Sequence, residues 1–166
     1  MKIALFTETF LPKVDGIVTR LTKTIEFLIK NGDEVIIFCP EGCPESYMGA
    51  TVVGVAAMPL PLYPELKLGL PGPAVSDKLE KFNPDLIHVV NPAVLGLGGI
   101  WLAKTNNIPL IASYHTHLPK YLEHYGMGML EPLLWELLKA AHNQALLNLC
   151  TSTAMVNELK DKGIQR

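Results

Sequence analysis

Residues 1–40 read MKIALFTETFLPKVDGIVTRLTKTIEFLIKNGDEVIIFCP, and this stretch decides the fold. A short apolar run over residues 3–6 predicts a buried strand that ends at the polar pair Thr7-Glu8. Asp15-Gly16 then opens a helix with apolar positions at helical spacing, and Asn31-Gly32 supplies its left-handed stop. A second strand follows over residues 35–38. Strand, helix and strand in this order predict a right-handed βαβ unit with parallel strands.

The rest of the chain repeats this alternation of short apolar runs and helical patterns. We expect strands over residues 50–55, 86–90, 110–114 and 146–150, and helices over 74–82, 92–104 and 153–162. A long amphipathic helix is marked by Leu130, Leu134, Leu137, Leu138, Ala141 and Ala145. Five prolines predict an ordered loop over residues 58–73. Because strands this apolar on both faces belong to covered parallel sheets, the fold class is α/β: a Rossmann-like parallel sheet sandwiched by helices, in a single domain spanning 1–166.

The composition excludes several classes of protein. A net charge of -2 gives no basic excess for nucleic acid. No window approaches the roughly 20 apolar residues of a membrane span, and the first apolar run is too short for a signal peptide. Cys39, Cys43 and Cys150 are odd in number and scattered, so they predict neither disulfides nor a metal site. We expect free thiols, buried at Cys39 and Cys150, in a cytoplasmic protein that does not cross a membrane.

Three segments are candidates for a ligand site, because ligands of such sheets bind outside the carboxyl ends of the strands. They are residues 7–16, 91–99 and 115–125. In the first segment, Gly16 lets a ligand approach the backbone, whose free N–H groups at a helix start favour an anion such as a diphosphate. The same residues also fit a plain strand-to-helix loop in which Asp15 is an N-cap. The pattern alone leaves both interpretations open.

Two histidines mark the third segment. His115 and His117 stand at i and i+2 on an extended segment, so their side chains point the same way. A metal site needs a third or fourth ligand, and the other histidines are not at a recognisable spacing. We therefore expect no metal and interpret the pair as partners of a sugar hydroxyl or a phosphate oxygen, with ordinary hydrogen-bonded loop histidines as the alternative. The isolated carboxylates establish neither an acid–base pair nor a Ser-His-Asp arrangement.

Apolar and aromatic side chains are frequent in two predicted loops, residues 58–73 and 118–134, and Trp135 lies just beyond the second. If they are exposed, they suit a membrane interface, with lysines such as Lys67 facing anionic headgroups. If they are buried, they form a lid or a domain contact. We expect Trp135 and the leucines near it to be buried, and residues 58–73 to be exposed.

Several motifs together resemble the N-terminal domain of family 4 glycosyltransferases, which have the two-domain GT-B fold. The first unit matches through Pro12-x-x-x-Gly16 and Asn31-Gly32-Asp33-Glu34-Val35. Later matches are Phe82-Asn83-Pro84-Asp85-Leu86-Ile87-His88 and Ser113-Tyr114-His115-Thr116. Within the family the chain looks most like sulfoquinovosyltransferases, through Pro44-Glu45-Ser46-Tyr47-Met48-Gly49-Ala50, His115-Thr116-His117-Leu118-Pro119 and Leu149-Cys150-Thr151-Ser152-Thr153-Ala154-Met155. The similarity spans essentially the whole chain.

This resemblance implies a retaining transfer of sulfoquinovose from UDP-sulfoquinovose to diacylglycerol by a protein peripheral to the membrane, with no cofactor and no catalytic metal. His115 is implied to be catalytic, contacting the transferred sugar and stabilising charge in the transition state. Gly16 and Thr116 are the implied donor-binding residues. The acceptor-binding candidates are Thr9, Phe10, Lys13, Tyr63 and Lys67.

Two departures limit what the resemblance implies. Asp15 stands where the family has a second glycine, which puts a diphosphate contact by that residue in doubt. The family's C-terminal donor-binding domain does not follow within these 166 residues, so we expect the isolated chain to bind donor poorly and to be inactive. A related family 4 glucosyl- or mannosyltransferase is the alternative, as is a non-catalytic module peripheral to membranes, because one fold hosts many functions.

Overall fold

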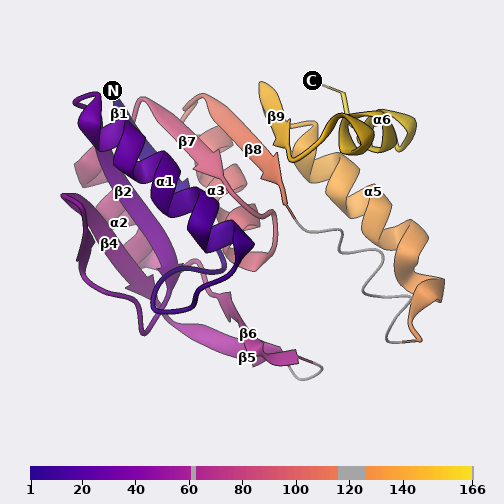
Figure 1. The fold of residues 1–166 in the computed structure, drawn as a ribbon, viewed down its shortest axis with the longest axis horizontal. Helices are drawn as coiled ribbons and strands as arrows, with labels where there is room; N and C mark the ends of the chain where they lie inside the picture. The colour runs from indigo at the N-terminus through magenta and orange to yellow at the C-terminus, as the bar shows by residue number, and fades with distance from the viewer. Residues whose placement is uncertain (61–62, 116–125, 166) are drawn as a thin grey trace.

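The computed structural model describes residues 1–60, 63–115 and 126–165 (Figure 1). Its main sheet has seven strands in the order β3-β4-β2-β1-β7-β8-β9. Six strands run parallel: β1 (Lys2–Phe6), β2 (Glu34–Pro40), β4 (Ala50–Val55), β7 (Leu86–Val89), β8 (Leu110–Tyr114) and β9 (Leu147–Cys150). The short edge strand β3 (Ser46–Tyr47) is antiparallel to β4 and was not predicted.

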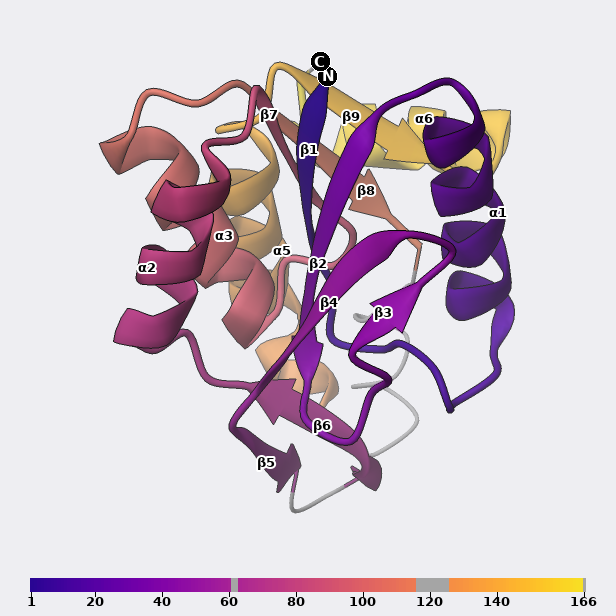
Figure 2. The same ribbon diagram turned by 90° about the vertical axis from the view of Figure 1, so that its left-hand side faces the viewer.

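Helices cover both faces of the sheet, so the predicted α/β class is confirmed. Figure 2 shows α1 (Gly16–Lys30) and α6 (Thr153–Asp161) on one side, and α2 (Pro73–Phe82), α3 (Val94–Thr105) and α5 (Glu131–His142) on the other. A short 3-10 helix, η1 (Gly128–Leu130), precedes α5. Within the described ranges, no helix combines the length and the apolar character that a membrane crossing requires.

Helix α1 begins and ends where the sequence predicts. The Asp15 carboxylate accepts a hydrogen bond from Val18 N at 2.9 Å, so Asp15 is the N-cap. Gly32 follows the last turn with a φ of 83°, a left-handed conformation that favours glycine. Between these ends, Val18, Leu21 and Ile25 are buried against the sheet.

Alternation along the strands builds a separate core on each face. In β1, Ala4 and Phe6 join the core under α2 and α3, whereas Ile3 and Leu5 join the core under α1. The Phe6 ring stacks on the Phe38 ring of β2 with centroids 4.7 Å apart. Two buried faces explain why these strands are apolar throughout. The cysteines are free as expected, although Cys150 is only half-buried.

The prediction of a loop over residues 58–73 is wrong. Strands β5 (Ala57–Leu60) and β6 (Tyr63–Gly69) form an antiparallel pair there, with Met58 opposite Leu68. A two-stranded sheet consists only of edge strands, and these tolerate prolines that a central strand would not. The predicted exposure of this segment holds for Met58, Lys67 and Leu70.

The prediction of which residues form the buried face of α5 is partly wrong. Leu130 precedes the helix and is 46% exposed, and Leu137 is 59% exposed. The helix instead buries Trp135, Leu138 and Ala141, because the Trp135 ring stacks on Tyr114 of β8 and fixes which side faces the sheet. The predicted burial of Trp135 is confirmed.

Substitution of Gly99 tests the close packing of α3 on the sheet. A Cβ at Gly99 would lie 2.7 Å from the ring of Phe6, and that ring is fully buried and stacked on Phe38. We expect Gly99→Ala to lower the unfolding free energy of residues 1–166 by about 1–3 kcal/mol in urea denaturation. Gly72→Ala is the control without a clash: its Cβ meets open space at a negative φ, and only the preference of the α2 N-cap for glycine over alanine is lost, so we expect a decrease of less than about 1 kcal/mol. Equal effects of the two substitutions would contradict this packing.

Candidate functional site

The loop after β1 is held to the start of α1 by its own polar side chains. Thr7 Oγ1 donates to the carbonyl oxygen of Thr9 at 2.8 Å. Thr9 Oγ1 donates to Asp15 Oδ2 at 3.2 Å, and the same carboxylate caps α1. The Lys13 ammonium lies 3.8 Å from Asp15 Oδ2. These contacts give residues 7–15 a defined shape at the carboxyl edge of the sheet.

Glu8 carries its carboxylate into the interior, where it is 4% exposed. Its Oε1 accepts from Leu95 N at 2.6 Å and its Oε2 from Gly69 N at 2.9 Å. Ala93 at the N-cap of α3 offers no side-chain hydrogen bond, so Glu8 caps that helix from a distance. Burial raises the pKa of Glu8, although the backbone N–H groups that it accepts from act in the opposite direction.

A pocket of about 210 Å³ opens beside this loop. Among the residues that line it are Thr9, Phe10, Lys13 and Lys67, four of the five predicted acceptor-binding residues. The fifth, Tyr63, has a side chain outside the described part of the structure. Lys67 comes from β6, far along the chain from the loop, so the fold brings together candidates that the sequence could only name one by one.

Gly16, the first residue of α1, has open space around it. A Cβ at this position would meet no atom within 4 Å, and its φ is not in the left-handed region. Packing among the described residues therefore does not require a glycine here. Gly16 is exposed, whereas Val18 N in the same turn is already bonded to the Asp15 carboxylate.

Two histidines lie at the carboxyl ends of β7 and β8. His88 Nε2 and Ser113 Oγ are 2.7 Å apart and share a hydrogen bond. Burial, together with the nearby His115 and Arg20, lowers the pKa of His88 to about 4. Burial, followed by the charge of Arg20, also lowers the pKa of His115. Both imidazoles are therefore neutral at pH 7, and each can donate one hydrogen bond and accept another.

The structure describes only the first residue of the candidate segment 115–125. Thr116 and His117 lie outside the described residues. Among the residues that the structure does describe, no group of three or more His, Cys, Asp or Glu side chains is arranged to hold a metal ion.

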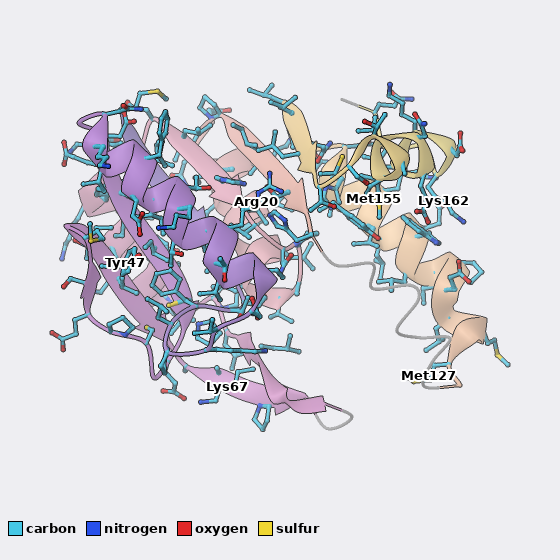
Figure 3. All side chains as sticks on the ribbon, in the orientation of Figure 1. Arg20, Tyr47, Lys67, Met127, Met155 and Lys162 are labelled. Atoms are coloured by element: carbon cyan, nitrogen blue, oxygen red, sulfur yellow. The ribbon has the colours of Figure 1, made fainter. Side chains whose placement is uncertain are left out.

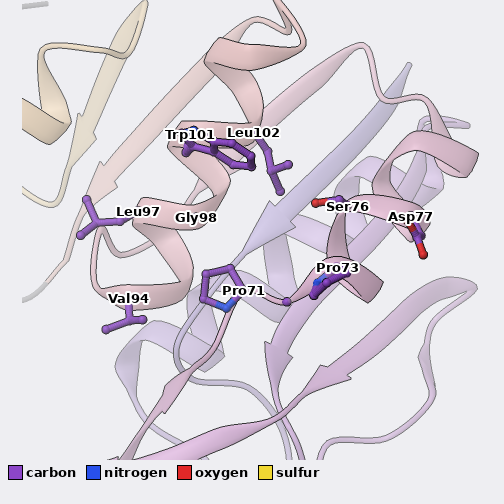
Figure 4. A pocket seen from close by; sticks show the side chains of 10 residues that line it. Pro71, Pro73, Ser76, Asp77, Val94, Leu97, Gly98, Trp101 and Leu102 are labelled. Carbon is purple, nitrogen blue, oxygen red and sulfur yellow. The ribbon is translucent and has the colours of Figure 1, made fainter.

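A larger hollow of about 720 Å³ lies between α2 and α3 (Figure 4). Its lining is mostly apolar and includes Pro71, Leu97 and Trp101, with Ser76 and Asp77 at one side. None of the predicted site residues lines it.

Comparisons with known proteins show the family of the chain. A family model described as Glycosyltransferase Family 4 matches residues 14–166. A GDP-mannose-dependent alpha-mannosyltransferase of Corynebacterium glutamicum is 33% identical over 99% of this chain and 41% of its own length. A sulfoquinovosyl transferase of Arabidopsis thaliana is 35% identical over 95% of this chain and 32% of its own length. An alpha-monoglucosyldiacylglycerol synthase of Streptococcus pneumoniae is 30% identical over 78% of this chain and 30% of its own length. The chain thus spans less than half the length of each of these relatives.

The buried carboxylate of Glu8 predicts a pH dependence of stability. Its pKa in the folded chain lies above the ordinary value of 4.5, so the unfolded chain loses this proton first as the pH rises. The contribution of Glu8 to stability is therefore full below about pH 4.5 and declines as the pH rises toward the folded-state pKa. We expect the unfolding free energy of the parent chain minus that of Glu8→Gln to fall between pH 4 and pH 7 in urea denaturation. A difference that stays constant across this range would show that Glu8 does not titrate as described.

Proposed function

Because the chain belongs to glycosyltransferase family 4, we propose that it is the acceptor-side domain of a retaining enzyme that transfers sulfoquinovose from UDP-sulfoquinovose to diacylglycerol. One observation carries the proposal: the loop that contains Gly16 and the segment that begins at His115 leave the same edge of the sheet in a chain of this family. Strand β7 alone separates β1 from β8, so the two segments start roughly 10 Å apart. These starting points are Thr7 and His115, and we propose that one donor molecule extends from His115 to Gly16 at the start of α1.

Similarity to one relative supports the proposed donor. The Arabidopsis thaliana relative is a sulfoquinovosyl transferase, and its similarity covers 95% of this chain. A second candidate is mannosyl transfer from GDP-mannose, which is favoured by the Corynebacterium glutamicum relative at 33% identity over 99% of the chain. Both candidates need a nucleotide diphosphate at the same place. Val18 N is already bonded to the Asp15 carboxylate, so the diphosphate is proposed to meet the N–H groups of Gly16 and Ile17, where the backbone of Gly16 is exposed.

In the proposed reaction, the bond between the anomeric carbon and the diphosphate breaks and UDP departs with the electron pair. The acceptor hydroxyl oxygen forms the new bond on the same face of the sugar, and its proton leaves with the diphosphate. His115 is neutral at pH 7, so it can donate a hydrogen bond to the transferred sugar without placing a full positive charge beside the developing one. Thr116 is proposed as a further donor-binding residue.

The acceptor is proposed to bind in the pocket lined by Thr9, Phe10, Lys13 and Lys67. Its volume of about 210 Å³ is below the range of pockets that enclose whole ligands of drug size, and it suits a glycerol headgroup whose acyl chains remain in the bilayer. The two ammonium groups suit an anionic membrane surface. On the neighbouring hairpin, Met58 is 57% exposed and can contact lipid. These features support a domain that works at a membrane surface.

A transfer assay tests the proposed function. The complete protein encoded by the reading frame that contains these residues is mixed with diacylglycerol liposomes and radiolabelled UDP-sulfoquinovose, UDP-glucose or GDP-mannose. We expect lipid product from UDP-sulfoquinovose, and a loss of roughly 10²–10³ in kcat for His115→Ala, the size of effect seen when one transition-state hydrogen-bond donor is removed. Lys104→Ala, an exposed change at the far end of α3, is the control and should leave kcat unchanged.

The other outcomes of this assay are equally informative. Product from GDP-mannose and none from the sulfonated donor would establish the second candidate. Binding to liposomes without transfer from any of the three donors would contradict glycosyl transfer and favour a non-catalytic module.

A further inference from the structure

Arg20 is a cation without a partner carboxylate among the described residues. It lies in the second turn of α1, next in sequence to the exposed Thr19 and the buried Leu21, and its own side chain is exposed. Figure 3 shows it reaching from α1 toward β8. The ion pairs found within residues 1–60, 63–115 and 126–165 do not include Arg20.

The strand register turns His88 and Ser113 toward the same side as Arg20, and His115 lies two positions beyond Ser113. His88 lies beside Leu5 of β1, and Leu5 belongs to the core under α1. The neighbours Ile87 and Val89 belong to the opposite core, under α2 and α3. Because side chains alternate along a strand, His88 faces the α1 side. Ala112 of β8 likewise belongs to the opposite core, so Ser113 faces the α1 side and holds His88 by the 2.7 Å hydrogen bond.

The charge of Arg20 acts on the same two histidines. The charge of Arg20 lowers the pKa of both His88 and His115, in each case after the larger effect of burial. One permanent cation and two neutral imidazoles thus share a face of the sheet, and no described carboxylate forms an ion pair with the cation. An exposed cation attracts an anion, and a neutral imidazole beside it can donate a further hydrogen bond to that anion.

We infer that Arg20 recognises the sulfonate of the donor sugar, with His115 donating a second hydrogen bond. This inference rests on the proposed function, in which His115 contacts the transferred sugar. A planar guanidinium presents paired N–H donors that match the oxygens of a sulfonate, as they match those of a carboxylate or phosphate. Arg20 lies four residues beyond Gly16, about 6 Å along the helix axis, and is therefore set back from the start of α1 where the diphosphate is proposed to bind.

The test uses the complete protein with Arg20→Gln, Arg20→Lys and, as a matched loss of charge on the same helix, Lys30→Gln. Two quantities are measured for each: kcat/KM with UDP-sulfoquinovose, and the inhibition constant of UDP, which lacks the sugar. We expect Arg20→Gln to lower kcat/KM roughly 10- to 100-fold, since it removes hydrogen bonds to a charged group, and to leave UDP inhibition unchanged. Arg20→Lys should lose less, because it keeps the charge but not the paired donors, and Lys30→Gln should behave like the parent.

The inference and the proposed function can fail separately. If the parent protein uses UDP-sulfoquinovose and Arg20→Gln is equally active, the inference is wrong and the proposed function stands. If Arg20→Gln weakens UDP inhibition as much as it lowers kcat/KM, Arg20 contacts the diphosphate and the sulfonate assignment is wrong. If the parent protein does not use UDP-sulfoquinovose, both fail together.

Discussion

The carboxylate of Glu8 accepts hydrogen bonds from Leu95 N and Gly69 N, and these two contacts join three parts of the molecule that are far apart in sequence. They tie the loop after β1 to the start of α3 and to the end of β6. The loop carries Thr9, Phe10 and Lys13, and β6 carries Lys67, so the same contacts fix both sides of the proposed acceptor pocket. Burial of the charged carboxylate is unfavourable, so the pKa of Glu8 is raised. The hydrogen bond from Leu95 N at the start of α3 partly offsets this cost.

The proposed chemistry is distributed over the segments that follow β1, β7 and β8, which lie side by side in the parallel sheet. The loop after β1 is proposed to hold the acceptor and, at Gly16, the diphosphate, while the ends of β7 and β8 present neutral imidazoles. The two faces of the sheet also differ in character. On the α1 side, Arg20 supplies a positive charge with no carboxylate forming an ion pair with it among the described residues, whereas the hollow between α2 and α3 is mostly apolar. The proposed polar substrate chemistry therefore lies at one edge and on one face.

Much of this fold follows from local patterns, and the failures have identifiable physical causes. The strand at Leu110–Tyr114 and the cap at Asp15 were predictable because apolar runs and capping residues act over a few positions. The β5–β6 pair was missed because proline density was interpreted as a loop, although edge strands accept prolines. Leu137 was misplaced because helical spacing alone does not determine which stripe of α5 the Tyr114–Trp135 contact selects. Glu8 could not be interpreted from its neighbours, since one of its partners, Leu95, lies 87 positions away.

The central claim is that the acceptor lipid binds at the loop after β1, and photo-crosslinking tests it most directly. A diacylglycerol with a photoreactive group near its glycerol headgroup is irradiated in liposomes with the complete protein, and the labelled peptides are sequenced by mass spectrometry. Labelling of the peptides that contain Lys13 and Lys67, reduced by unlabelled diacylglycerol, is the expected result. Labelling confined to the peptide that contains Leu97 and Trp101 would place the lipid between α2 and α3 and would contradict the claim.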